Sequence, residues 1–330
     1  MTKVDGCDNI IQAFKVNDRG DPLKEKELYR LVHVSQLYYE ENKTQSEIAQ
    51  ELEISRPAVS YLLKKAREAG IVKIDVLSYH RTIRGIRHEM CQRFNLKSCY
   101  VVTLPDDIYQ AGADVLLDFL PKTKILGLGW GYNISKIIEA FPQQSKTGIN
   151  SGTICPLIGA TTAPQRGYHP DDLVNELAIK TGYQAELLNS LAFPTTIAEQ
   201  AQVMEADNFK QISDYWKRTT TALVTLGSFP SVPDHGSALR FGRKLIEQQA
   251  VGCLLSYFFN PQGELIKGEE DYTIQIPLNF LSHVRDVIGF VPQEANVSAI
   301  LSGLETGLIN HLVITESLAS EIIKTQSVKI

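Results

Sequence analysis

The first hydrophobic pattern along the chain has the period of a helix. Within residues 27–41 apolar residues recur every three or four positions, with polar residues opposite: Leu28, Leu31, Val34 and Tyr38. Thr44 and Glu47 then have the spacing of a capping box, in which each side chain accepts a hydrogen bond from the other residue's backbone N–H. A second, short helix is therefore predicted to begin after Thr44.

A third helix is predicted directly after the second. Ser55 is a favourable N-cap residue, Pro57 lies in the first turn, where no amide donor is lost, and Gly70 is typical of a helix end. The apolar stripe between these residues predicts one buried face: Val59, Leu62, Leu63 and Ala66. The alternating residues 71–77 predict a strand. Three helices and a β wing predict an α+β winged helix-turn-helix domain.

Beyond residue 77 the pattern changes to that of a larger α/β domain. Residues 78–96 predict a linker helix, after which continuously apolar runs alternate with amphipathic segments: CYVVTL, KILGLGW, GTICPLIG, QAELLNSL, ALVTLG, VGCLLSYFF, VIGFV and HLVIT. This alternation predicts a mostly parallel, Rossmann-like sheet covered on both faces. The predicted organisation is thus multidomain, with a loose extension over 1–22, the winged domain over 23–77 and the α/β domain over 97–330.

Composition and charge narrow the class of protein. The net charge is -5, yet residues 55–74 hold five basic residues and one acid, Glu68, so this segment is locally positive. The five cysteines are scattered without a CxxC pair, which argues against a disulfide framework and a zinc site. The sequence has neither a secretory leader pattern nor an apolar run long enough to span a membrane. A cytoplasmic protein without membrane association is therefore expected.

The helical pattern suggests contact with double-stranded DNA. In a helix-turn-helix the second helix of the pair enters the major groove, and its first residues meet base edges. Arg56 is predicted to bind a guanine edge, Gln45 a phosphate and Lys64 the DNA backbone. The other candidate contacts are Thr44, Ser55, Pro57, Ser60 and Tyr61. The alternative is an ordinary three-helix bundle with a solvated basic face.

Two segments of the α/β domain are candidates for binding a small ligand. KILGLGWGYNISKIIEAF has the layout of a turn whose free backbone N–H groups face an anion at a helix start. Its candidate contacts are Gly129, Trp130, Gly131 and Asn133. PLIGATTAPQRGYHPDD adds Gly159, Ala160 and His169, next to Arg166. The alternative is that the glycines only form turns and that His169 is a surface residue.

The residues from LVHVSQLYYEENKTQSEIAQ to the end of KKAREAGIVKIDV resemble the N-terminal domain of the SorC family of bacterial sugar-responsive transcription regulators. That family typically has a QLYYE-like helix followed by TQ.EIA and VSRLLK.AR..GIV patterns. The chain departs from the family at two positions. Glu53 replaces the usual glycine between the helices, which requires a left-handed backbone or a reshaped turn. Tyr61 replaces an arginine, which should change operator preference or phosphate affinity.

The resemblance continues through the landmarks GLGWG, PLIGA, NELA, ALVTLGS, GCLLSYFFNPQGELI and AILSGLETGLINHLVITESLA. It implies a fold similar to sugar-phosphate isomerases and deaminases, a homotetramer, and DNA binding modulated by a sugar, polyol or sugar phosphate. YHPDD and QISDYW are most similar to sorbitol and sorbose operon regulators. Asn260 stands where the family usually has an acid, and Gln293 and Asn296 lie where it has Gly-Gly-x-x-Lys. These three residues are predicted effector contacts, and their lack of charge predicts a less anionic ligand.

Three classes of function follow from these patterns. The leading prediction is a regulator of a carbohydrate-utilisation operon that binds operator DNA. An isomerase-like enzyme would need a positioned acid/base pair, but neither such a spacing nor a metal-ligand spacing stands out. No catalytic residue, metal or cofactor is therefore predicted. A DNA-binding protein that no longer senses a ligand stays open because of Asn260 and Asn296.

Overall fold

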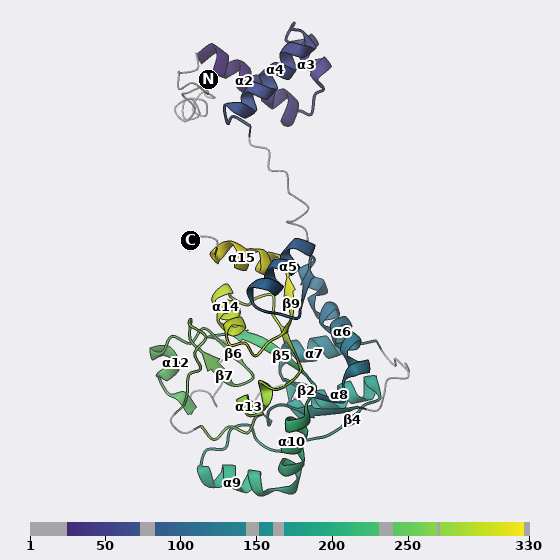
Figure 1. Ribbon diagram of the computed structural model, residues 1–330, viewed down its shortest axis with the longest axis vertical. Coiled ribbons are helices and arrows are strands. Elements are labelled where there is room, and N and C mark those ends of the chain that lie inside the picture. The colour runs from purple at the N-terminus through teal and green to yellow at the C-terminus, as the bar shows by residue number, and fades with distance from the viewer. Residues whose placement is uncertain are drawn as a thin grey trace, which may run out of the picture. The chain divides into compact units, whose positions relative to one another are not determined.

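The computed structural model describes residues 25–72, 83–142, 152–160, 168–230, 240–268 and 271–326. The chain divides into two compact units, residues 1–78 and 79–330 (Figure 1). The described part of the first unit consists of three helices: α2 (Glu25–Tyr39), α3 (Gln45–Glu51) and α4 (Arg56–Glu68). The predicted extension and nearly all of the predicted wing lie outside the described residues.

Side-chain caps start the second and third helices, as predicted. Thr44 Oγ1 accepts a hydrogen bond from the Glu47 N–H at 3.3 Å, and a Glu47 carboxylate oxygen accepts one from the Thr44 N–H at 2.8 Å. Ser55 Oγ accepts from the Ala58 N–H at 3.3 Å. The apolar stripes of the three helices meet in one small core, which contains Val34, Leu37, Ile48, Val59 and Leu63. This burial holds α3 and α4 as a helix-turn-helix pair.

Glu53 adopts the left-handed conformation that its position between the helices requires. Its φ is 50°, and the next N–H, of Ile54, donates to the Ala49 carbonyl at 3.0 Å. A residue with a side chain in this conformation costs roughly 1–2 kcal/mol. The first of the two outcomes expected for the replaced glycine is therefore the one observed.

The second unit is built on a parallel sheet with the strand order β1-β9-β8-β5-β2-β3-β4. Its strands are β1 (Ser98–Val102), β2 (Ile125–Leu128), β3 (Thr153–Pro156), β4 (Gln184–Ala185), β5 (Thr221–Ser228), β8 (Asp286–Phe290) and β9 (His311–Thr315). The prediction of a mostly parallel α/β sheet is confirmed. Of the predicted strand QAELLNSL only two residues pair with the sheet, as β4.

The run VGCLLSYFF forms two strands, whereas its continuous hydrophobicity predicted one. β6 (Gly252–Leu254) and β7 (Tyr257–Phe259) pair antiparallel with each other, and β6 also pairs antiparallel with β5. Leu255 has a φ of 54° and reverses the chain between them. Both strands are largely buried, so their hydrophobicity does not mark the turn.

Helices cover both faces of the sheet. One face carries α5 (Ile83–Arg93), α10 (Asp207–Arg218), α14 (Val297–Glu305) and α15 (Glu316–Gln326), and the other carries α6 (Ile108–Phe119), α7 (Tyr132–Ala140) and α8 (Pro170–Thr181). The remaining described elements are η2 (Pro105–Asp107), η3 (Leu120–Lys122), α9 (Ile197–Glu205), α12 (Lys244–Glu247) and α13 (Leu278–Leu281). The linker segment contains α5, whose Ile86 and Met90 are buried in the core of the second unit. Among the described residues, no helix is long and apolar enough to cross a bilayer.

The order of the strands locates the place where a ligand is expected. β2 and β5 are neighbours, but the chain leaves β2 towards β3 and β4 and leaves β5 towards β8 and β9, on the opposite side. Such a reversal opens a crevice beyond the carboxyl ends of the two strands, which is where open α/β sheets bind ligands. The side of the sheet where the parallel strands end is called the carboxyl edge below. The side where they begin is called the amino edge.

Candidate DNA-binding surface and ligand site

The predicted DNA contacts of α4 share one exposed face of the helix. That face consists of Arg56, Pro57, Ser60, Tyr61 and Lys64. The opposite side buries Val59, Leu63 and Ala66 against the other two helices. Tyr61 is 62% exposed, and Lys64 Nζ lies 3.6 Å from a Glu68 carboxylate oxygen. Packing thus leaves the predicted recognition residues free to meet a partner.

A hollow of about 540 Å³ joins the starts of α3 and α4. Three of the predicted DNA contacts line it: Thr44, Gln45 and Arg56. Five further residues line it without having been predicted: Tyr38, Tyr39, Asn42, Lys43 and Ser46. Lys43 pairs with Glu51 at 2.7 Å and with Glu41 at 3.0 Å. Acids of the same unit therefore largely neutralise its charge. Arg56, which makes no ion pair with a described residue, is the uncompensated cation of this hollow.

The glycine-rich turn after β2 is closed by its own hydrogen bonds. The Gly129 N–H donates to the Leu223 carbonyl at 2.8 Å, and the Gly131 N–H donates to the Tyr168 carbonyl at 3.3 Å. These two amides are therefore taken, whereas the start of α7, where the anion was expected, has no side-chain cap. The turn still needs glycine at Gly131, where φ is 94°. Asn133 Oδ1, also predicted as a contact, accepts a hydrogen bond from the Tyr109 hydroxyl at 3.1 Å.

Aromatic side chains gather at the start of α7 beside this turn. Tyr109 stacks on Phe290 with 5.6 Å between the ring centroids and meets Tyr132 edge-on at 6.3 Å. Tyr132 in turn meets Tyr168 edge-on at 5.8 Å. Burial, helped by the nearby charge of Glu294, raises the pKa of Tyr109 to about 12, so its hydroxyl keeps its proton. These tyrosines are dispersed in the sequence, and only the fold brings them together.

Two buried polar atoms at the carboxyl edge have no hydrogen-bond partner. They are His169 Nδ1 and Thr225 Oγ1, and the described residues contain no other such side-chain atom. Thr225 lies on the same face of β5 as Leu223, whose side chain packs in the core under α6, α7 and α8. His169 immediately precedes α8, which covers that same face. Both atoms therefore belong to the side of the crevice where α7 begins.

Asn296 brings the start of α14 to the same edge of the sheet. Its side-chain oxygen accepts a hydrogen bond from the Ala299 N–H at 2.7 Å and so caps the helix. Its own N–H donates to Ser228 Oγ, at the end of β5, at 2.9 Å. Gln293 is exposed in the loop between β8 and α14. The segment that replaces the family's Gly-Gly-x-x-Lys therefore lies beside the crevice.

The structure does not bring Asn260 to this site. Its Oδ1 accepts from the Gln262 and Glu264 N–H groups, each at 3.0 Å, and its Nδ2 donates to the Glu264 carboxylate at 2.9 Å. The turn that it forms packs against Ser302 near the end of α14. Ser302 lies six residues beyond Asn296, or about 9 Å along the helix axis. Asn260 therefore serves the hairpin turn.

Gly159 and Ala160 connect two loops of the second unit. The Gly159 N–H donates to the Ile274 carbonyl at 2.9 Å, and the Ala160 N–H donates to the Ser190 carbonyl at 2.7 Å. A Cβ at position 159 would lie 2.8 Å from the Ser190 carbonyl oxygen, so the close approach requires glycine. The backbone amides of these two predicted contacts are thus already occupied.

The charge near the crevice is small. Arg240 is buried close to it, but its guanidinium binds both carboxylate oxygens of Asp271, at 3.0 and 2.9 Å, and also binds Ser256. Lys136 of α7 lies 5.7 Å from the centre of the Tyr132 ring, but its charge is paired with Glu139 at 2.5 Å. Arg166 lies outside the described residues. The described residues contain no group of histidine, cysteine, aspartate or glutamate side chains that could hold a metal ion.

Comparison with known proteins identifies the family of the chain. Residues 84–324 match the family model described as "Putative sugar-binding domain", and residues 34–76 match the MarR family model. The chain is 30% identical to the sorbitol operon regulator of Klebsiella pneumoniae over 311 residues, which cover 89% of this chain and 97% of that protein. The chain belongs to the SorC family. It is a DNA-binding transcription regulator with a sugar-binding type of domain, and its relatives are regulators, not enzymes.

Solved structures of SorC-family proteins agree with this assignment. The crystal structure of the full-length sorbitol operon regulator SorC from Klebsiella pneumoniae has a TM-score of 0.67 and 28% identity, and the match covers 90% of this chain and 99% of that one. A probable sor operon regulator from Shigella flexneri has a TM-score of 0.62 and 26% identity, over 72% of this chain and 98% of that one.

A further relative by sequence is the deoxyribonucleoside regulator of Bacillus subtilis (strain 168). It is 24% identical over 310 residues, which cover 88% of this chain and 96% of that protein.

Proposed function

We propose that this regulator senses an uncharged sugar or polyol at the carboxyl edge of its sheet and that binding changes its affinity for operator DNA. The observation that carries the proposal is the pair of unpartnered buried atoms, His169 Nδ1 and Thr225 Oγ1. Leaving a buried polar group unpaired costs roughly 1–3 kcal/mol. A ligand hydroxyl both donates and accepts, so it satisfies Thr225 and either tautomer of His169.

The lack of available positive charge favours an uncharged ligand. A phosphate would call for a lysine, an arginine or a row of free amides. Arg240 is neutralised by Asp271, so the described part of this edge offers a phosphate only the uncapped start of α7, without a free cation beside it. Asn296 offers an amide in a segment where the family usually has a lysine. Given the named relatives, a hexitol or ketohexose of the sorbitol and sorbose type is the ligand class that we propose.

The proposed mechanism couples the ligand to DNA through the assembly of subunits. We propose a cytoplasmic homotetramer in which the ligand favours one arrangement of the subunits and so sets the spacing of paired DNA-binding units. Such coupling requires that the two arrangements bind the ligand with different affinity. Gln45, Arg56, Ser60, Tyr61 and Lys64 are the residues that we propose to contact the operator.

Titration calorimetry with sorbitol, sorbose and their phosphates tests the ligand class. We expect binding of an uncharged member of the set and weaker binding of its phosphate. A clear preference for the phosphates would contradict the proposal. Thr221→Val is the matched control for Thr225→Val, because Thr221 lies on the same strand but its hydroxyl has a partner, the hydroxyl of Thr123. Only Thr225→Val is expected to lose binding.

A regulator that binds DNA without sensing a ligand is the second candidate. The use of Asn260 within its own hairpin favours it. Thermal unfolding with and without the sugars distinguishes the two, since a ligand at a hundred times its dissociation constant adds about 2.7 kcal/mol to stability. The second candidate predicts no shift with any of them.

A further inference from the structure

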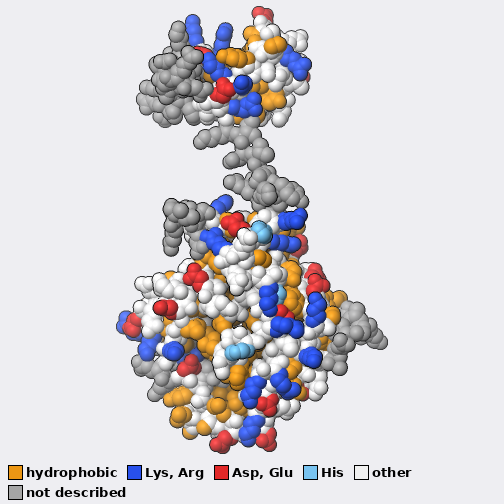
Figure 2. Space-filling view, viewed as in Figure 1, with side chains coloured by type: hydrophobic (Ala, Val, Ile, Leu, Met, Phe, Trp, Pro, Cys, Tyr) orange, Lys and Arg blue, Asp and Glu red, His pale blue; other side chains and the backbone are white. Residues whose placement is uncertain are grey.

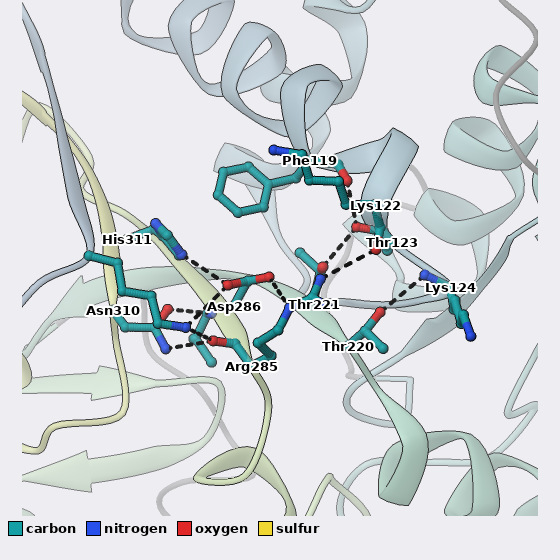
Figure 3. A network of polar contacts seen from close by, with 12 residues as sticks. Phe119, Lys122, Thr123, Lys124, Thr220, Thr221, Arg285, Asp286, Asn310 and His311 are labelled. Atoms are coloured by element: carbon teal, nitrogen blue, oxygen red, sulfur yellow. Dashed lines mark hydrogen bonds and ion pairs between the residues drawn. The ribbon is translucent and has the colours of Figure 1, made fainter.

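The amino edge of the sheet carries a polar cluster that is separate from the ligand site (Figure 3). Asp286 starts β8 and is buried, and it accepts hydrogen bonds from Arg285 Nε at 2.6 Å, from His311 Nε2 at 3.2 Å and from Lys97 Nζ at 3.2 Å. His311 Nδ1 lies 2.7 Å from Ser98 Oγ. The cluster thus joins the first residues of β1, β8 and β9 and holds two exposed cations in place.

Cations outnumber acids around this cluster. Lys97 and Arg285 share the single negative charge of Asp286, and their side chains are 49% and 55% exposed. Lys122, Lys124 and Arg218 are exposed as well, and none of the three makes an ion pair with a described residue. Arg285 Nη2 donates to the Lys122 carbonyl at 3.3 Å, which links these cations to the cluster.

Unpaired cations also occur elsewhere in the described second unit, at Arg84, Arg87, Lys267 and Lys324, but on this edge three of them accompany the two cations that share Asp286. Elsewhere in the second unit several cations have an acid three or four residues away: Lys136 with Glu139, Lys180 with Glu176, Lys210 with Asp207, and Arg243 with Glu247. Lys and Arg side chains also gather over α6, α7, α8 and α10 in Figure 2, with fewer Asp and Glu side chains between them. In a chain of net charge -5, such a surface points to an anionic partner.

Cations at helix ends have an ordinary explanation, because they balance the negative end of the helix dipole. That explanation covers Arg218, at the end of α10, and Lys122, at the end of η3. It does not cover Lys97, Lys124 and Arg285, which each directly precede a strand. The amino edge therefore carries more positive charge than the fold requires.

The spacing of these cations suits an extended polyanion. Lys97, Arg285 and Lys124 precede β1, β8 and β2, and Arg218 lies three residues before β5, so they are spread over five neighbouring strands. At a strand spacing of about 4.8 Å the row is roughly 19 Å long. Duplex DNA rises about 3.4 Å per base pair, so the row spans the backbone of about six base pairs.

We propose that the amino edge of the second unit binds the phosphate backbone of duplex DNA that flanks the operator site. DNA is the favoured polyanion because the first unit of the same chain binds it, which raises its effective concentration at the second unit. These contacts add affinity without reading sequence. The proposal rests on DNA binding and is independent of the ligand.

The test uses the full chain and two DNA duplexes. The short duplex is the operator site that the protein selects from a pool of random sequences. The extended duplex is the same site with a constant flanking sequence on each side. Lys122→Gln/Lys124→Gln is compared with Lys210→Gln/Lys244→Gln, which removes the same charge from α10 and α12. The slope of log affinity against log salt is measured for each pair of protein and duplex. On the extended duplex the slope for Lys122→Gln/Lys124→Gln should be smaller in magnitude by about 1.8, because each lost phosphate contact removes about 0.9. On the short duplex its slope should equal that of Lys210→Gln/Lys244→Gln. Equal slopes for both variants on the extended duplex would overturn the proposal.

Lysine acetylation followed by mass spectrometry provides a measurement on the unaltered protein. The extended duplex at saturation should reduce labelling of Lys122 and Lys124 several-fold and leave Lys210 unchanged. Unchanged labelling of all three would overturn the proposal and would leave an acidic protein as the partner to consider. Equal protection of all three would also overturn it, because the contact would then not be confined to the edge.

Discussion

Replacing Thr225 by valine should stabilise the second unit and remove its ligand response. Valine has nearly the shape of threonine, so the change exchanges a buried, unpartnered hydroxyl for a methyl group. Relieving an unpaired buried polar group returns roughly 1–3 kcal/mol. We therefore expect the free energy of unfolding to rise by about 1 kcal/mol or more, although most substitutions in a buried strand lower it.

The same strand contains a control with the opposite sign. Thr221 lies four residues earlier on the same face of β5, and its Oγ1 is 2.7 Å from Thr123 Oγ1. Thr221→Val removes that hydrogen bond and should cost about 1 kcal/mol. The two variants have the same chemistry, the same strand and the same direction of the side chain, so a difference in sign isolates the unpaired state of Thr225.

Denaturant unfolding followed by tryptophan emission measures both variants. The two tryptophans of the chain, Trp130 and Trp216, both belong to the second unit, so the signal reports that unit. Addition of sorbitol or sorbose should raise the midpoint for the wild type and for Thr221→Val, but not for Thr225→Val. If Thr225→Val loses as much stability as Thr221→Val and keeps the ligand response, the argument from unpaired buried atoms is wrong.

Three further predictions concern other parts of the molecule. Arg56→Ala should cost about 1–3 kcal/mol in operator binding and relax preference at one base position, as measured by binding to a panel of single-base variants; an unchanged preference would remove its role in base reading. Glu53→Gly should stabilise the first unit by about 0.5–1 kcal/mol, since relief of the left-handed strain exceeds the entropy cost of glycine; destabilisation in far-UV melting would contradict this. Burial lowers the pKa of His311 below 6.5 despite the opposing effect of Asp286, so the unfolded chain binds a proton first as the pH falls. Stability should therefore drop between about pH 7 and the lower folded pKa, and His311→Gln should flatten this part of the profile; an identical profile would contradict it.

Local signals predicted the helix-turn-helix well because its elements are defined by short-range chemistry. Thr44 and Ser55 each cap a helix through a residue only three positions away. The strain at Glu53 also follows from its place in a tight turn. The sequence pattern was less informative for residues 251–259, where the turn at Leu255 is made by an apolar residue between two buried strands.

The ligand site depends on contacts between distant parts of the chain, which explains what was not predicted. The Gly129 and Gly131 amides are taken by Leu223 and Tyr168, and neither partner is evident from a glycine pattern. Asn260 was placed with Asn296 by resemblance, but the hairpin turn takes it towards the other end of α14. Thr225 could have been singled out, because it is a polar residue within the apolar strand ALVTLGS.

The central claim is that an uncharged sugar or polyol controls the DNA affinity of this regulator. Fluorescence anisotropy of the full chain on its selected operator duplex, with sorbitol, sorbose and their phosphates in turn, tests it most directly. We predict that an uncharged member of this set changes the dissociation constant for wild-type protein and for Thr221→Val but not for Thr225→Val. A dissociation constant that responds only to the phosphates, or that responds equally in all three proteins, would contradict the account.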